Sequence, residues 1–110
     1  MSDPLASIEV HDRGEELVIR IIGEVDLSNA DELGEQIERR VTVRDPRRLT
    51  LDLADVEYID SRGVLLLMRL SARLRDQAIG LRVLAPPDSV AGRLLAIAGL
   101  GELSCGRAAP

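Results

Sequence analysis

The chain has 110 residues and a mass of 12.0 kDa, a length that fits a single domain covering residues 1–110. With 45% apolar and 30% charged residues, it is too apolar to be intrinsically disordered. The net charge is −5 and Tyr58 is the single aromatic residue, which argues against direct nucleic-acid binding, because an acidic surface repels phosphates and few rings can stack on bases.

The first part of the chain has the pattern of an antiparallel hairpin followed by a helix. Residues 8–12 alternate between apolar and polar, and residues 16–22 are rich in β-branched side chains, so a short turn joins two strands. We expect residues 23–27 to leave the second strand. A helix is then expected to begin with Ser28 as its cap, with acidic residues in its first turn, and to end before Pro46.

The rest of the chain alternates strands with helices. The expected elements are a strand at 48–53, a connection at 55–60, a helix from about 61 to 77, a strand at 81–85, a helix at 90–98, room for a last short strand near 103–105, and a frayed tail at 106–110. In the first of these strands Leu49, Leu51 and Leu53 share one face, and Thr50 lies on the other.

This order predicts an α/β domain with a mixed sheet, formed by an N-terminal antiparallel hairpin and then parallel βαβ units, with a core over about residues 8–103. Parallel strands covered on both faces read as continuous apolar runs, whereas most strands here alternate. The helices are therefore expected to cover mainly one face of the sheet and to leave the other comparatively polar. Such a sheet argues against a doubly wound nucleotide-binding fold.

No motif of a cofactor-dependent or metal-dependent enzyme is found in the sequence. There is no glycine-rich phosphate loop, and Gly99 and Gly101 follow a helix instead of opening one. His11, the only histidine, is expected to lie exposed on a strand, and Cys105, the only cysteine, cannot form a disulfide within the chain. We therefore expect no cofactor, no metal and no catalytic activity.

The apolar runs and the first residues of the chain bear on its location in the cell. The longest unbroken run, Val64–Met68, is far shorter than the roughly 20 residues that span a bilayer. Residues 1–4 have neither the basic nor the apolar region of a secretion signal. A cytoplasmic protein without membrane insertion is expected.

The most informative segment is Asp60-Ser61, at the expected start of the second long helix. The N-terminus of a helix carries unpaired N–H groups and a partial positive charge, so the simplest interpretation is that both residues are caps. A stripe at helical spacing forms the core side of this helix: Gly63, Leu67, Leu70, Leu74 and Ala78.

The apolar run Val64–Met68 wraps the full circumference of the same helix, so at least one of its residues must face away from the sheet. Leu65 is the first choice and Met68 the second. An apolar spot beside an exposed serine suits docking of a partner, unless the third helix covers it.

Three groups of residues resemble the motifs of a known family. Residues 23–26 (Gly-Glu-Val-Asp), together with 51–53 (Leu-Asp-Leu) and 60–63 (Asp-Ser-Arg-Gly), resemble the STAS domain, and more closely the small single-domain anti-sigma factor antagonists of bacteria. The resemblance covers about residues 8–103 in element order, size and motif. It implies a STAS-like fold in a protein that binds partners and is not a catalyst.

The resemblance also implies a mechanism. In the family, the unphosphorylated form binds an anti-sigma factor, usually a serine kinase of the histidine-kinase-like ATPase class, and so releases a sigma factor. The kinase phosphorylates the serine after the Asp of the motif, here Ser61, and a PP2C-type phosphatase restores the binding form. The candidate partner-binding residues are Asp26, Ser28, Asp60, Ser61, Arg62, Gly63, Val64, Leu65 and Met68.

Arg62 is a departure from the family, which usually carries Ser or Thr after the phosphoacceptor. A long cation at this position can pair with Asp60, screen the phosphate or obstruct a kinase pocket. Two other functions fit the same fold. One is a regulatory subunit that docks on the ATPase of a membrane transporter without a phosphoswitch. The other is a module that senses a nucleotide or lipid near Asp26 and Ser61.

Overall fold

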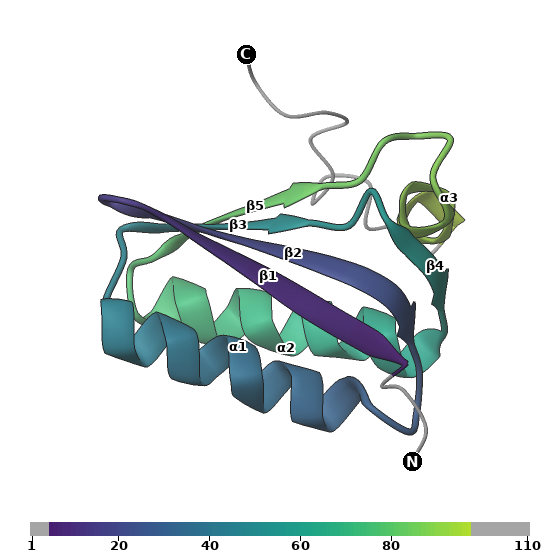
Figure 1. Ribbon diagram of the computed structural model, residues 1–110, viewed down its shortest axis with the longest axis horizontal. Helices are drawn as coiled ribbons and strands as arrows, with labels where there is room; N and C mark the ends of the chain where they lie inside the picture. Colours follow the sequence, from purple (N-terminus) through teal and green to yellow (C-terminus); the bar gives the residue numbers. More distant parts are fainter. Residues whose placement is uncertain (1–4, 98–110) are drawn as a thin grey trace.

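The computed structural model describes residues 5–97 of the chain (Figure 1). Its elements are β1 (Ala6–Arg13), β2 (Glu16–Val25), α1 (Ala30–Arg44), β3 (Arg48–Asp52), β4 (Val56–Ile59), α2 (Ser61–Asp76), β5 (Gly80–Leu84) and α3 (Val90–Ile97). The strand expected near 103–105, Cys105 and the glycines at 99 and 101 lie outside the described residues. No helix within residues 5–97 is long and apolar enough to cross a membrane.

The strands form one mixed, five-stranded sheet in the order β1-β2-β3-β5, with β4 also paired to β2. β1 and β2 are antiparallel, and the other pairs are parallel. β2 pairs with β3 along residues 16–20 and with β4 along residues 23–25. The predicted mixed sheet is therefore confirmed, and the long strand β2 is its centre.

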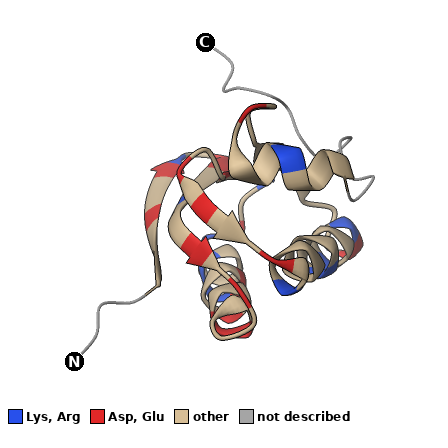
Figure 2. Cartoon of the chain, turned by 90° about the vertical axis from the view of Figure 1, so that its right-hand side faces the viewer, with Lys and Arg blue, Asp and Glu red and all other residues tan. Residues whose placement is uncertain are grey.

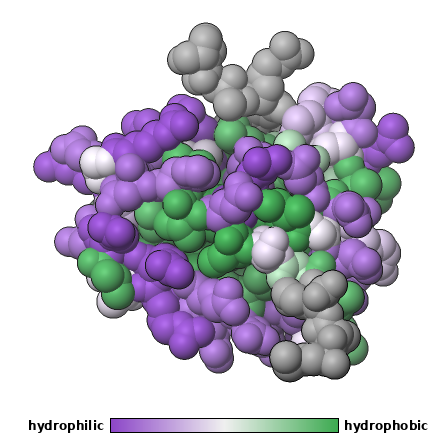
Figure 3. All heavy atoms as spheres, viewed as in Figure 1, coloured by the Kyte–Doolittle hydropathy of each residue, from purple (hydrophilic) through white to green (hydrophobic). Residues whose placement is uncertain are grey.

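Both long helices, α1 and α2, cover the same face of the sheet (Figure 1). The core lies between them and the strands, where aliphatic side chains from β2, β3, α1 and α2 are buried: Leu17, Ile19, Ile21, Ile37, Leu49, Leu51, Leu67, Leu70 and Leu74. Seen from the β1 side, apolar residues gather in the middle of the molecule and hydrophilic ones cover most of its periphery (Figure 3). Each such aliphatic side chain stabilises the fold by about 1.5–3 kcal/mol.

The core stripe predicted for α2 is confirmed at four positions and wrong at the fifth. Gly63, Leu67, Leu70 and Leu74 are buried. Ala78 is exposed, because the helix ends at Asp76 and Ala78 follows it with a positive φ of 59°.

The opposite face of the sheet is comparatively polar, as predicted. Arg20 on β2 pairs with Asp55 and also lies 3.5 Å from a carboxylate oxygen of Glu9. Thr50 lies on this face too but is only 3% exposed, and its hydroxyl donates a 2.6 Å hydrogen bond to Glu16. The buried hydroxyl is therefore satisfied, as a buried polar group must be.

Two expectations about the strands are wrong. β2 does not end at residue 22 but continues to Val25, with a register shift after Gly23, whose φ of +109° suits glycine. Residues 56–59, expected as part of a loop, form β4. They pair with the part of β2 that is free after β3 ends, and Val56 and Ile59 are buried there.

The third helix, α3, packs beside β4, across the sheet from α1 and α2 (Figure 1). It therefore does not cover the outward flank of α2, where Met68 is 47% exposed. The apolar spot on α2 is accessible on this side.

Candidate partner-binding site

Asp60 is the N-cap of α2. One carboxylate oxygen, Oδ1, accepts hydrogen bonds from the backbone N–H groups of Arg62 at 2.9 Å and Gly63 at 3.1 Å. Its own N–H donates to the carbonyl of Val25 on β2 at 3.2 Å. The predicted cap is confirmed for Asp60, and it fixes the first turn of the helix against the end of β2.

The second carboxylate oxygen of Asp60 reaches across to the loop between β2 and α1. Oδ2 accepts a 3.0 Å hydrogen bond from the backbone N–H of Leu27. These two residues are 33 positions apart in sequence. Nothing in the local pattern around either residue indicates this contact, because it depends on where β2 and β4 end side by side.

The loop before α1 is held by its own polar side chains. Asp26 accepts hydrogen bonds from the backbone N–H of Ser28 at 2.8 Å and from its hydroxyl at 2.5 Å. The side chain of Asn29 accepts from the N–H of Asp26 and donates to the carbonyl of Glu24. These hydrogen bonds fix the conformation of the loop between β2 and α1 without any contact from a partner.

The expectation that Ser28 caps α1 is wrong. The N-cap is Asn29, and the helix begins at Ala30 without a side-chain cap bond. The reason is that the side-chain amide of Asn29 is hydrogen-bonded to the backbone of Asp26 and Glu24 in the loop, while the hydroxyl of Ser28 donates to Asp26. Acidic residues do stand in the first turn, as expected.

Ser61 is exposed as the first residue of α2. Exposed apolar side chains lie near it: Leu27 is 68% exposed and Met68 47%. Met68 follows Ser61 by about two helical turns and so lies on the same side of α2. The site therefore combines an exposed hydroxyl with an apolar surface.

The ranking of the apolar residues of α2 needs correction. Leu65, the first choice for an outward position, is half-buried, as is Val64, whereas Met68 is exposed. Gly63 is buried against Ile59 and Val25, so its part in the site is indirect, through packing.

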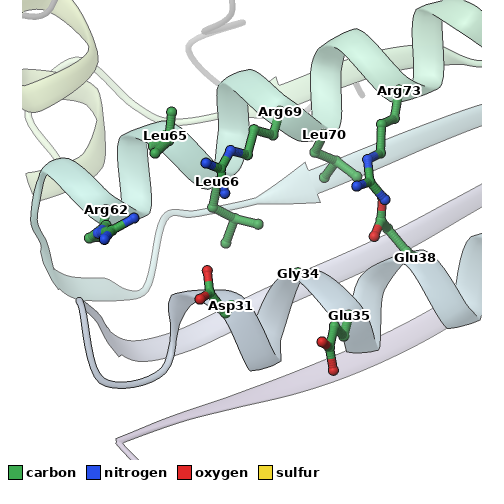
Figure 4. Close-up of a pocket in the computed structure, with 10 residues that line it drawn as sticks. All are labelled: Asp31, Gly34, Glu35, Glu38, Arg62, Leu65, Leu66, Arg69, Leu70 and Arg73. Atoms are coloured by element: carbon green, nitrogen blue, oxygen red, sulfur yellow. The ribbon is translucent and has the colours of Figure 1, made fainter.

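Arg62 does not pair with Asp60 through its side chain. Within the described part of the chain, its guanidinium has no ion pair or hydrogen bond, and the side chain lies toward α1 (Figure 4). The cation therefore leaves the carboxylate free to hold the backbone of α2 and of the loop.

Ser61 directly follows one carboxylate and lies close in the fold to a second. Asp60 is the residue before it, and Asp60 accepts from the backbone N–H of Leu27, which is next to Asp26. Figure 2 shows acidic residues on this side of the molecule. Among residues 5–97, no group of three His, Cys, Asp or Glu side chains is placed to hold a metal ion. A negative group added to Ser61 would thus lie in an already negative region.

Asp60→Asn and Asp60→Ala are expected to separate the two roles of this carboxylate. The Asn carbonyl keeps the cap of α2, but its NH₂ group cannot accept from Leu27, whereas Ala loses both contacts. We expect Ala to lower the free energy of unfolding by about 1–2 kcal/mol more than Asn does. Urea unfolding measures this, and hydrogen exchange of the Leu27 amide should accelerate in both variants. Equal unfolding free energies for the two variants would contradict the assignment.

A family model described as the Mlab, STAS domain matches residues 8–104. The chain therefore belongs to the STAS domain family, as its motifs predicted. The family makes this chain a regulatory protein-binding domain and not an enzyme.

Several solved structures have the same fold as this chain. An anti-sigma factor antagonist from Mycobacterium paratuberculosis is 25% identical and superposes with a TM-score of 0.80, covering 99% of this chain and 92% of its own. The anti-sigma factor antagonist SpoIIAA in its unphosphorylated form is 20% identical, with a TM-score of 0.76 over 94% of this chain and 89% of its own. The Bacillus cell fate determinant SpoIIAA in its phosphorylated form is also 20% identical, with a TM-score of 0.70 over 94% and 92%. These three similar structures are thus of anti-sigma factor antagonists.

Proposed function

We propose that this chain is an anti-sigma factor antagonist that binds an anti-sigma factor through the surface around Ser61 and thereby releases a sigma factor. The observation that carries the proposal is the exposed Ser61 at the start of α2. The exposed Leu27 is bound through its backbone to the neighbouring Asp60, and the exposed Met68 lies about two turns further along the same helix. The likeness to the mycobacterial antagonist over 99% of the chain supports it.

Phosphorylation of Ser61 switches this binding off in the proposed mechanism. A phosphate adds about −1.5 to −2 charges at pH 7. Asp60 already occupies the N–H groups of Arg62 and Gly63, so the new charge lies beside a carboxylate with few free donors. One similar protein, the Bacillus SpoIIAA, has been solved in a phosphorylated form, which supports a modified state of this fold.

The partner in this proposal is an anti-sigma factor of the histidine-kinase-like ATPase class, which is also the serine kinase, and a PP2C-type phosphatase reverses the modification. An interface that already contains ATP phosphates would be repelled by a phosphate on Ser61. The residues assigned to partner contact are Asp26, Ser28, Asp60, Ser61, Arg62, Val64, Leu65 and Met68, with Gly63 as packing support.

A pull-down from lysate of the native host tests the proposal, with wild type, Ser61→Asp and Ser7→Asp as baits and mass spectrometry as readout. Ser7 is an exposed serine on β1 and serves as the matched control. We expect wild type and Ser7→Asp, but not Ser61→Asp, to recover a small kinase-like ATPase. With ATP, that kinase should add a single phosphate to wild type and none to Ser61→Ala.

Other outcomes point to the other two functions. Equal recovery of a transporter ATPase by all three baits would contradict the proposal and favour a regulatory subunit without a phosphoswitch. A copurifying nucleotide or lipid, lost in the Ser61→Asp protein, would instead favour a ligand-sensing module.

A further inference from the structure

A groove of about 270 Å³ runs between α1 and α2, on the side of the helices that faces away from the sheet (Figure 4). One end lies at Arg62, next to Ser61, and the other at Arg73. Its floor is apolar and is formed by Leu66 and Leu70 from α2, and Leu65 lies at its outer edge. Leu65 and Leu66 are only half-buried, so apolar surface remains open along the groove.

The two walls of the groove carry opposite charges. α1 contributes Asp31, Glu35 and Glu38, and α2 contributes Arg62, Arg69 and Arg73. One pair closes across the far end, where Arg73 donates to Glu38 at 2.7 Å.

Unlike that pair, the other four wall residues, Asp31, Glu35, Arg62 and Arg69, have no side-chain hydrogen bond or ion pair within residues 5–97. Their charges are therefore available to an occupant that presents the complementary signs.

We propose that this groove docks an amphipathic helix from a protein partner. Its apolar ridge would lie on the leucine floor, with basic side chains toward α1 and acidic side chains toward α2. The span from Arg62 to Arg73 is about 17 Å at 1.5 Å per residue, or about three helical turns. Anchors at i, i+4 and i+7 of a bound helix span about two turns and fit within it.

The charges also exclude other kinds of occupant. A nucleic acid or an anionic lipid surface would meet the carboxylates of α1, which repel phosphates as strongly as the arginines attract them. A helix, in contrast, can carry both signs on its two flanks. This inference goes beyond the proposed function, because it does not require Ser61 to be modified.

The opposed walls further determine the direction of the bound helix. A helix with basic residues on one flank and acidic residues on the other matches both walls in one direction only. Exchanging its flanks reverses the direction instead of abolishing binding. The informative control is therefore a helix with the same residues but with the two signs interleaved on both flanks.

Two synthetic peptides of about 14 residues, or four turns, test the proposal by titration into the full-length ¹⁵N-labelled chain. Both carry the same leucine ridge, and their Lys and Glu residues are either segregated by flank or interleaved. We expect the segregated peptide to shift the amides of Gly34, Leu65 and Leu66 and to bind about tenfold more tightly than the interleaved one.

A charge-reversed variant gives the second comparison. Glu35→Lys with Arg69→Glu reverses one charge on each wall and should abolish the preference for the segregated peptide. As the control, Glu32→Lys with Arg75→Glu reverses charges on exposed residues of the same two helices outside the groove. This variant should keep the preference for the segregated peptide. Absence of shifts with either peptide, equal affinities in the wild type, or a preference that survives reversal of the walls would each overturn the proposal. None of these results bears on Ser61, which the Ser61→Asp bait tests separately.

Discussion

Replacement of Ser61 by Asp is expected to weaken binding of the anti-sigma partner about a hundredfold, which corresponds to about 3 kcal/mol. The new carboxylate would lie beside Asp60, which is itself hydrogen-bonded to the backbone of Leu27, the neighbour of Asp26. A charge there disfavours an interface that contains phosphates, and it must be desolvated when the partner binds. Isothermal titration with the partner from the pull-down measures the change.

The fold should tolerate this substitution. Ser61 is exposed at the N-terminus of α2, where the helix dipole favours an acidic side chain by about 0.3–1 kcal/mol. Repulsion from Asp60 offsets part of that gain. We therefore expect the free energy of unfolding to change by less than about 0.5 kcal/mol.

Two controls make the affinity result interpretable. Ser61→Ala removes the hydroxyl without adding charge and should bind as wild type does. Ser7→Asp adds the same charge on β1, at an exposed residue outside the assigned contact surface, and should also leave affinity unchanged. Equal affinities of Ser61→Ala and Ser61→Asp would refute the electrostatic switch. So would a loss of stability in Ser61→Asp large enough to account for the weaker binding.

Gly63→Ala is expected to destabilise the fold by about 1–3 kcal/mol, the usual cost of overpacking a core. A Cβ at this position would lie 2.4 Å from Cγ1 of Ile59 and 3.1 Å from Cγ1 of Val25. The helix cannot simply retreat, because Asp60 binds the N–H of Gly63 and is itself hydrogen-bonded to β2 and to Leu27. Partner binding should weaken as well, since Ser61 moves with the first turn.

A matched glycine and a second substitution sharpen this test. At Gly80 the nearest atoms to an added Cβ are 3.9 Å away, so Gly80→Ala should change the unfolding free energy by less than about 0.5 kcal/mol. Ile59→Ala shortens the obstructing side chain. The double variant Gly63→Ala/Ile59→Ala should therefore lose less unfolding free energy than the sum of the losses of the two single variants. Strict additivity in urea unfolding would show that the close approach at Gly63 is not the cause.

The sequence alone predicted the features that rest on local patterns. The mixed α/β sheet covered on one face, the buried stripe Leu67, Leu70 and Leu74 on α2, and the cap at Asp60 all follow from periodicity and from the chemistry of a helix start. The same patterns, with the paired motifs, indicated the STAS family. Local geometry repeats every two or 3.6 residues, so one chain is enough to read it.

The tertiary structure decided where distant segments meet. The strand at 56–59 escaped prediction because its burial does not alternate and its existence depends on the free part of β2. The ranking of Leu65 above Met68 was wrong, because α1 shelters one side of α2 and leaves the other open. The bond from Asp60 to Leu27, and the groove with oppositely charged walls, need elements that are neighbours only in space. Such contacts leave no periodic signal in the sequence, since they are set by the packing of whole helices and strands.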